Sequence, residues 1–200
     1  FSVPEPLMIT GPSGIGKSSL VKAIAGLWES GQGTIGCPQL QKDAEQEFQL
    51  LYLPQQPYMT LGTLRQQLLY PDHHRIDFSD RDLLDILQSV QLSELNDLDQ
   101  VADWSEQLST GEQQRLAFAR MLLKKPAYAI LDEATSALSI QQEKTLYQQL
   151  TKTNTTFVSV GHRPSLLAYH SQILTIKNSR SWTLAKSEDR SDSDNLLAFS

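Results

Sequence analysis

Residues 11–18 read Gly11-Pro12-Ser13-Gly14-Ile15-Gly16-Lys17-Ser18 and match the phosphate-binding loop pattern G-x-x-x-x-G-K-[ST] at every specified position. The residues before this loop, Leu7 to Thr10, are apolar and β-prone and predict a buried strand. After the loop, Leu20, Val21 and Ile24 recur with helical spacing. A strand, a glycine-rich turn and a helix in this order predict a nucleotide-binding site in an α/β fold.

The chemistry of the loop follows from its residue types. Glycine lets successive backbone N–H groups turn toward one anion, and the N-terminus of the following helix adds partial positive charge. Lys17 is expected to reach the β- and γ-phosphates of a nucleotide, and the Ser18 hydroxyl is expected to bind Mg²⁺. The alternative is a glycine-rich turn without a ligand, and the strand and helix on either side argue against it.

The composition limits the class of protein. A chain of 200 residues suits one domain, and its net charge of −6 argues against a nucleic-acid-binding surface. No apolar run approaches the roughly 18 residues that cross a bilayer, and no signal peptide opens the sequence. Cys37 is the single cysteine, so we expect no internal disulfide. Phe1 to Val3 looks like the end of a strand, and we expect one or two further strands upstream of it.

Polar residues follow two later apolar runs, residues 48–53 and 128–131. Because ligands gather outside the carboxyl ends of parallel strands, Gln55 is placed to reach a metal or water, although a glutamine there is also an ordinary loop residue. Asp132 is placed like the carboxylate that holds Mg²⁺ in phosphate-loop enzymes. Glu133 is expected to point the other way along the strand and to orient a water for attack on the γ-phosphate. The alternative for both acids is a pair of solvated surface charges.

A further run, residues 155–160, predicts another core strand and is followed by His162. A histidine at this end of a strand, on the edge that carries the phosphate loop, can hydrogen-bond a γ-phosphate. His170 is expected to have a structural role instead. Residues 173–176 and 181–184 predict a final hairpin.

Helix signals fill the region between these strands. Residues 62–71 predict a short helix, and residues 79–90 predict an amphipathic one with Ser79 as its cap. His73 and His74 lack partner ligands and are expected to be solvated. The same is expected of four acids whose spacing matches no metal site, namely Asp97, Asp99, Asp103 and Glu106.

Two more helices have clear starts. Ser109 and Glu112 form a capping box, so a helix is expected from there to about Lys125. Ser139 begins a second such box, with a helix expected over residues 140–150. A serine and a glycine at the capped N-terminus near residue 110 form a second candidate phosphate cradle, although a plain capped helix explains them equally well.

The motifs together resemble those of an ABC transporter nucleotide-binding domain, and they stand in the same order. GPSGIGKSS resembles the Walker A loop, Gln55 the Q-loop glutamine and LSTGEQQR the signature motif. AILDE resembles Walker B, SALS the D-loop and His162 the switch histidine. The resemblance covers nearly the whole chain. YLPQQPYMTLGTLRQQLLYPD, ADWSEQLSTGEQQRLAFARMLL and VGHRPSLLAYH are most similar to the peroxisomal fatty-acyl half-transporters of subfamily D and their bacterial homologues.

The resemblance implies ATP and Mg²⁺ as ligands. It implies Lys17, Glu133 and His162 as catalytic residues, and Ser18, Gln55 and Asp132 as metal-binding residues. The nucleotide-binding residues would be Gly11, Pro12, Ser13, Gly14, Ile15, Gly16, Lys17, Ser18, Ser19 and Gln55. A second copy of the domain would add Ser109, Thr110, Gly111 and Glu112 in trans.

The resemblance also implies partners. Two nucleotide-binding domains would pack head to tail around two ATP molecules, with a transmembrane domain upstream on the same polypeptide and no nucleic acid involved. The domain would lie on the cytoplasmic side of a membrane, by preference the bacterial inner membrane.

The expected fold is α/β, with a phosphate-loop NTPase core of mainly parallel sheet flanked by helices and an inserted α-helical lobe. The core would comprise residues 1–61 and 126–185, and the lobe residues 62–125, which would also be the coupling surface. Residues 186–200 would form a mobile tail, and the first strand or strands of the core would lie upstream of the sequence.

Three departures from the family pattern are visible. Thr110 replaces the first glycine of the signature, and its side chain has to avoid the partner's nucleotide. Ser139 replaces the usual D-loop aspartate, which removes a charge from the expected dimer seam. The aromatic residue that stacks on adenine in this family would lie upstream of Phe1, which implies weakened nucleotide affinity for this sequence.

Three functions remain open at this point. The leading one is a transporter ATPase, and the second is a soluble ABC ATPase of other machinery, against which the acidic charge and the lack of a second cassette speak. The third is a switch that binds ATP without hydrolysing it, against which the presence of Glu133 and His162 speaks.

Overall fold

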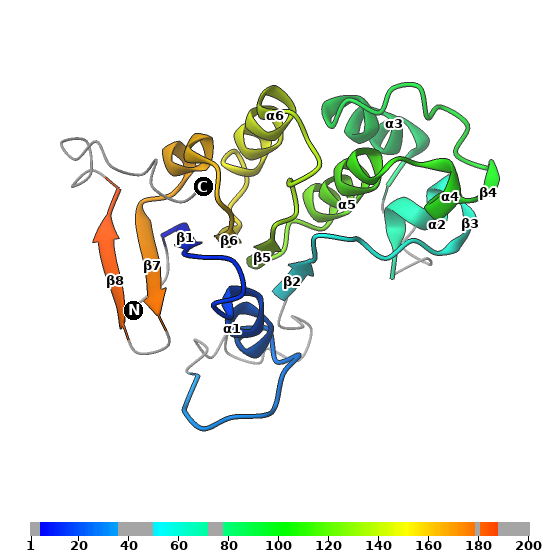
Figure 1. Ribbon diagram of the computed structural model, residues 1–200. Helices are drawn as coiled ribbons and strands as arrows, with labels where there is room; N and C mark the ends of the chain where they lie inside the picture. The colour runs from blue at the N-terminus through cyan, green and yellow to red at the C-terminus, as the bar shows by residue number, and fades with distance from the viewer. Residues whose placement is uncertain (1–4, 36–49, 72–77, 179–180, 188–200) are drawn as a thin grey trace, which may run out of the picture. The chain divides into compact units, whose positions relative to one another are not determined.

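The computed structural model describes residues 5–35, 50–71, 78–178 and 181–187 (Figure 1). The chain divides into two compact units. The first comprises Phe1–Tyr52, Pro126–Asp132 and Thr155–Ser200, and the second comprises Leu53–Lys125 and Glu133–Asn154. Cys37, His73, His74 and the expected mobile tail from residue 188 onward lie outside the described residues.

The first unit is built on a six-stranded sheet in the order β2-β5-β6-β1-β7-β8. Pairing is parallel between β5 and β6, β6 and β1, and β1 and β7, whereas β8 runs antiparallel to β7 (Figure 1). The prediction of a mainly parallel sheet in an α/β fold is therefore confirmed. The strands are β1 (Leu7–Thr10), β2 (Leu50–Leu53), β5 (Tyr128–Asp132), β6 (Thr156–Val160), β7 (Gln172–Asn178) and β8 (Ser181–Lys186).

The register of this sheet aligns three strand ends. Val160 at the end of β6 is paired with Ile9 of β1 on one side and with Asp132 of β5 on the other. These strands were predicted because they are short apolar runs, and most of their residues are buried, as expected for a sheet enclosed on both faces. The segments that follow β1, β5 and β6 consequently start from one edge of the sheet.

A compact apolar core holds this unit together. Val21 of α1 (Lys17–Ile24) packs with the inward residues of the central strands, which confirms the helical spacing expected after the phosphate loop. The cluster of buried residues comprises Leu7, Ile9, Val21, Ile130, Val160 and Leu174.

A buried histidine joins the end of the sheet to a short 3₁₀ helix, η1 (Pro164–Tyr169), which the sequence did not predict. His170 is 3% exposed, with Nδ1 2.7 Å from the carbonyl oxygen of Leu166 and Nε2 2.9 Å from the hydroxyl of Ser159. Because a carbonyl only accepts, Nδ1 carries the proton and Nε2 accepts from Ser159. The structural role predicted for His170 is confirmed.

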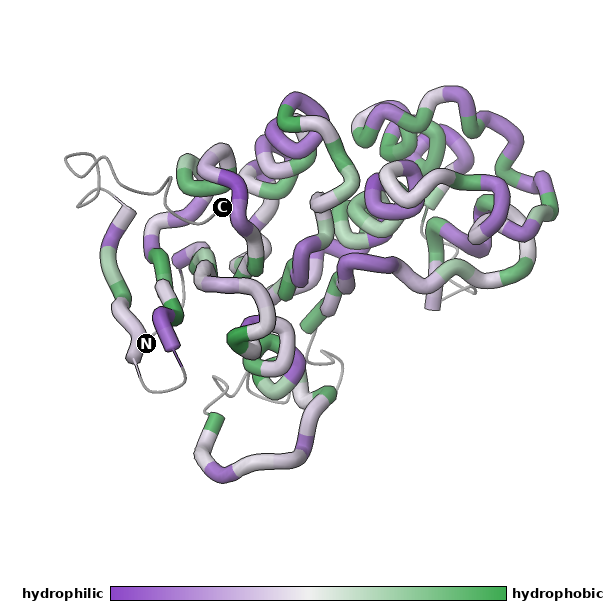
Figure 2. The backbone as a smooth tube through the Cα atoms, viewed as in Figure 1, coloured by the Kyte–Doolittle hydropathy of each residue, from purple (hydrophilic) through white to green (hydrophobic). Residues whose placement is uncertain are grey.

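The second unit is mainly helical, with helices α2 (Leu64–Leu69), α3 (Asp80–Ser89), α4 (Trp104–Gln107), α5 (Thr110–Lys124) and α6 (Ile140–Leu150). Reciprocal capping boxes start four of them, at Thr63, Ser79, Ser109 and Ser139. The last three were predicted, and the helix ends agree with the expected ones within one or two residues. Helix α3 carries both hydrophobic and hydrophilic residues (Figure 2), and its Leu83 and Leu87, four positions apart, are buried, in agreement with the predicted amphipathic helix.

Helix α5 is the centre of this unit, and both α2 and α3 contact it. Its buried Arg120 donates from Nε to the carbonyl of Gln67 at 2.6 Å and from an Nη to the carbonyl of Tyr58 at 2.7 Å. Burial lowers the pKa of Arg120 to about 10, which is still far above neutrality, so the guanidinium stays charged. Arg120 of α5 therefore holds both α2 and the segment before α2 by hydrogen bonds.

Three elements of the second unit were not predicted, namely the short helix α4 and two strands. Strands β3 (Leu61–Thr63) and β4 (Val101–Asp103) form a separate antiparallel ribbon. Each has only three residues, too few for an alternating pattern to appear. Asp103 is exposed, as predicted, and it also caps α4 by accepting from the N–H of Ser105 at 3.1 Å. No helix among the described residues is long and apolar enough to cross a membrane.

We expect the stability of the protein to depend on pH through His170. Burial lowers its pKa from 6.5 to about 4, so the unfolded chain takes up a proton that the folded chain resists. The stability that neutral His170 contributes is fully present above about pH 6.5 and is lost as the pH falls toward 4. The free energy of unfolding should therefore fall by about 2 kcal/mol between pH 7.5 and pH 5. Urea unfolding of wild type and His170→Gln at both pH values measures this. Equal losses of stability in the two proteins would contradict it.

We also expect Gly11→Ala to destabilise the protein much more than Gly14→Ala. Both positions have positive φ, 150° and 76°, so both substitutions strain the backbone by about 1 kcal/mol. A Cβ at Gly11 would in addition overlap the carbonyl oxygen of Ile176 on β7, whereas a Cβ at Gly14 meets no atom within 4 Å. Urea unfolding in the absence of nucleotide should show that Gly11→Ala lowers the free energy of unfolding by about 3 kcal/mol. Similar losses for the two variants would show that the β7 contact is unimportant.

Candidate nucleotide-binding site

The phosphate loop connects β1 to α1 and is shaped by glycine. Gly14 and Gly16 have φ of 76° and 98°, in the left-handed region that favours glycine. Gly16 is the N-cap of α1 and has no side chain to bond the free N–H groups of the first turn. N–H groups at the start of a helix can bind an anion, which is the role that the sequence analysis expects of this loop.

Lys17 folds back over this loop. Its Nζ donates to the carbonyl oxygens of Gly11 and Pro12, at 2.9 Å each, and the residue is only 5% exposed. A lysine ammonium is thus held against the loop that would carry the phosphates, where its charge is least screened by water.

Ser18 and Asp132 were both predicted to lie near a metal ion, and the structure brings them together. The Ser18 hydroxyl donates to Asp132 Oδ1 at 2.9 Å. This bond links the first turn of α1 to the end of β5, two elements far apart in sequence.

Tyr52, which the sequence analysis did not identify, completes this group. Its hydroxyl donates to Asp132 Oδ2 at 2.7 Å. Burial raises the pKa of the Tyr52 hydroxyl, and the neighbouring Asp132 carboxylate raises it further, so the phenol remains a hydrogen-bond donor. Only the adjacency of β2 and β5 reveals this contact.

The donor set fits a magnesium ion that is shared with a nucleotide. Mg²⁺ prefers oxygen ligands and commonly uses one or two protein groups together with phosphates and water. Ser18 and Asp132 supply a hydroxyl and a carboxylate. Within the described parts of the chain, no three His, Cys, Asp or Glu side chains form a group that could hold a metal ion.

Glu133 leaves the strand rather than continuing it. Its φ of 51° lies in the left-handed region, and the N–H of Ser136 donates to its carbonyl at 3.0 Å, which closes a turn. Strand alternation, on which the expected direction of Glu133 depended, does not apply, because β5 ends at Asp132. A non-glycine residue in this region is uncommon and accumulates at functional sites.

His162 lies where it was predicted, directly after β6. It is exposed, and Gly161 before it lies close to Leu166 of η1. The parallel register places this segment on the edge of the sheet from which the phosphate loop also starts. His162 therefore lies at the edge of the sheet from which the phosphate loop starts.

In the second unit, a glutamine network joins three segments that the sequence had singled out separately. The amide of the fully buried Gln114 on α5 donates to the carbonyl of Gln55 at 2.8 Å and to the hydroxyl of Ser136 at 3.2 Å. It also accepts from the N–H of Ala137 at 3.0 Å. Gln55 itself donates to Ser136 at 3.4 Å. No role for Gln114 was predicted, since a glutamine inside an amphipathic helix carries no distinctive signal.

The start of α5 is a fully formed capping box. Glu112 accepts from the N–H of Ser109 at 2.8 Å, and hydrogen bonds from Ser109 lower the pKa of the Glu112 carboxyl. Gly111 lies against the D-loop-like segment, because a Cβ there would be 3.4 Å from the carbonyl oxygen of Ala137. Ser109, Thr110, Gly111 and Glu112 are thus grouped at one helix start, with the hydroxyl of Ser109 occupied by the cap.

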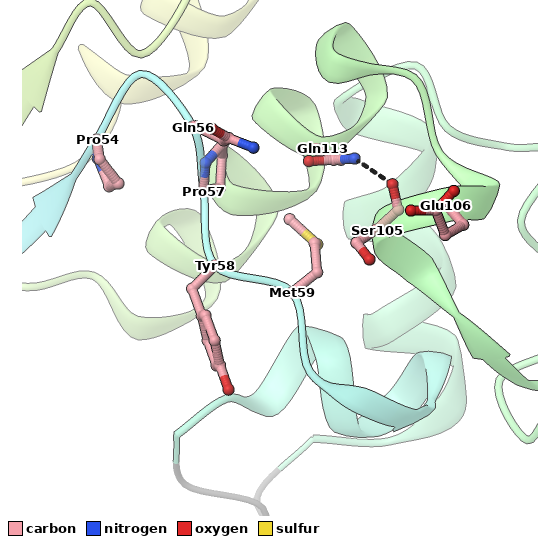
Figure 3. Close-up of a pocket in the computed structure, with 8 residues that line it drawn as sticks. All are labelled: Pro54, Gln56, Pro57, Tyr58, Met59, Ser105, Glu106 and Gln113. Atoms are coloured by element: carbon pink, nitrogen blue, oxygen red, sulfur yellow. Dashed lines mark hydrogen bonds between the residues drawn. The ribbon is translucent and has the colours of Figure 1, made fainter.

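A cavity of about 520 Å³ lies beside the segment that follows Gln55 (Figure 3). Gln113 spans one side of it and donates to the carbonyl of Ser105 at 2.9 Å, and the side chain of Tyr58 points away from Gln113. The lining residues are Pro54, Gln56, Pro57, Tyr58, Met59, Ser105, Glu106 and Gln113.

Comparison with known proteins identifies relatives along most of the chain. The family model described as ABC transporter matches residues 3–136. An uncharacterised ABC transporter ATP-binding protein of Synechocystis sp. is 52% identical over 90% of this chain and 26% of its own length. ABC transporter D family member 2, chloroplastic, of Arabidopsis thaliana is 40% identical over 96% of this chain and 33% of its own length.

A solved structure of an ABC exporter is also similar to this chain. A bacterial Atm1-family ABC exporter with ATP bound superposes with a TM-score of 0.77 and 25% identity, covering 94% of this chain and 35% of the exporter chain. The chain therefore spans about a quarter to a third of the proteins that it matches. Because the family model matches more than half of the residues, the chain belongs to the ABC transporter family, of which it carries the ATP-binding ATPase domain.

Proposed function

We propose that this chain hydrolyses ATP to ADP and phosphate and that the reaction drives a membrane transporter. The observation that carries the proposal is the Ser18–Asp132 hydrogen bond, which joins the phosphate loop to the acid at the end of β5. A structural glycine turn would not require a carboxylate at this point.

The proposed roles follow the chemistry of each side chain. Lys17 and the N–H groups of the loop bind the β- and γ-phosphates, while Ser18 and Asp132, with Gln55, hold Mg²⁺. Bound Mg²⁺ would neutralise charge that develops on the phosphate oxygens. Glu133 polarises the attacking water, and His162 hydrogen-bonds the γ-phosphate.

We further propose that two copies work as a head-to-tail dimer. Ser109, Thr110, Gly111 and Glu112 of one copy would complete the ATP site of the other. The capping box supports this proposal because it holds four successive residues rigidly at a helix start. Thr110 and Ser139, which depart from the family pattern, would then lie near the partner or its nucleotide, and they are the positions at which the interface would differ from the usual one.

The remaining proposal concerns the membrane partner. The matched relatives are three to four times longer than the region they share with this chain, which leaves room for a transmembrane domain on the same polypeptide. The second unit exposes large apolar side chains at Tyr58, Leu61 and Val101, and exposed apolar residues mark interaction surfaces when they gather. We propose that residues 62–125 transmit the reaction to this partner from the cytoplasmic side of a membrane, with the bacterial inner membrane favoured.

The test is the rate of ATP hydrolysis per protein molecule, measured as the protein concentration rises. If the signature residues act in trans, the specific rate climbs with concentration and then saturates. Glu133→Gln should lower it by about 10²- to 10⁴-fold, because general-base assistance is lost. ATP binding should remain, since glutamine has nearly the same shape as glutamate.

The controls separate the parts of this proposal. A rate independent of concentration, in a sample shown by sizing to be monomeric, would contradict the trans site but not hydrolysis. Retained ATP binding without any hydrolysis at high concentration would contradict the ATPase role and favour a nucleotide-binding switch.

A further inference from the structure

We propose that Tyr52 is a positioning residue for the magnesium-binding carboxylate of Asp132, and that its hydroxyl sets the affinity of the nucleotide site for Mg²⁺. This inference rests on the proposed function and concerns a residue to which the sequence analysis assigned no role. Tyr52 would act through Asp132 and would not itself contact the metal or the reacting phosphate.

The geometry of the carboxylate carries the argument. Asp132 is 5% exposed, and each of its oxygens accepts from a different element. Ser18 at the start of α1 donates to Oδ1 at 2.9 Å, and Tyr52 on β2 donates to Oδ2 at 2.7 Å. The latter distance is characteristic of a charge-assisted O–H···O⁻ bond, which is about twice as strong as a neutral one.

Two donors on opposite oxygens have an effect that one donor lacks. With Ser18 alone, the carboxylate could turn about its Cβ–Cγ bond, because the terminal torsion of aspartate is broad. The hydrogen bond from Tyr52 removes this freedom and fixes the plane of the carboxylate. Groups that orient a metal ligand in this way commonly change metal affinity by about 10- to 100-fold when they are removed.

The ring and the hydroxyl of Tyr52 make different contacts, which can be removed separately. The ring packs at the margin of the core formed by Leu7, Ile9 and Ile130, and phenylalanine would preserve that packing. Only the hydroxyl reaches Asp132. Tyr52→Phe therefore removes the orienting bond while the apolar contact remains.

The experiment compares the binding of ATP in the presence of Mg²⁺ with binding in EDTA, by isothermal titration calorimetry of the whole chain. Tyr52→Phe should weaken the Mg²⁺-dependent part of ATP affinity by about tenfold. Affinity in EDTA should stay within about twofold of wild type, which also reports that the variant is folded. Tyr128→Phe, at the opposite end of β5, is the matched control and should leave both affinities unchanged.

A kinetic readout accompanies the binding data. The apparent KM for Mg²⁺ should rise in Tyr52→Phe, whereas kcat at saturating Mg²⁺ should return close to the wild-type value. A purely structural role would instead lower ATP affinity equally with and without Mg²⁺, and this outcome would overturn the proposal. The proposal would also be overturned if Mg²⁺ increased the ATP affinity of Tyr52→Phe as much as, or more than, that of wild type. If wild type itself binds ATP without any effect of Mg²⁺, the proposed metal site fails together with this inference.

Discussion

Parallel hydrogen bonding between β1, β5 and β6 is the constraint on which the candidate site depends. Val160 pairs with Ile9 on one side and with Asp132 on the other, so three strands end at the same edge of the sheet. The phosphate loop and the segment that carries His162 begin at these ends, and Asp132 is the last residue of β5. Their proximity is thus a property of strand direction and register, and the side chains add only the final hydrogen bonds.

Much of the fold could be predicted because its signals are local. The buried strands are short apolar runs, and capping boxes at Ser79, Ser109 and Ser139 marked helix starts from residues three positions apart. The ribbon of β3 and β4 escaped prediction because its pairing partners are distant and each strand has only three residues. The turn at Glu133 escaped because its backbone conformation, with a φ of 51°, leaves no trace in the residue type.

In the candidate site too, residues in local motifs could be predicted, whereas residues that depend on tertiary contacts could not. Lys17, Ser18 and Asp132 belong to motifs whose spacing encodes their chemistry, and the structure brings Ser18 and Asp132 into contact. Tyr52 and Gln114 hydrogen-bond to residues distant in the sequence, Tyr52 to Asp132 and Gln114 to Gln55. Such contacts depend on which strands and helices become neighbours, and a single sequence does not state this.

The position of β1 in the sheet has a consequence for the order of folding. β1 lies near the beginning of the sequence, yet both of its neighbours, β6 and β7, come from the last third of the chain. Forming these pairs requires closure of very long loops, and that entropy is lost before any ladder hydrogen bond forms. The phosphate loop follows β1, so we expect its position to be fixed only once β1 has paired with β6 and β7. ATP therefore cannot assist the early steps of folding and can stabilise only the nearly finished domain.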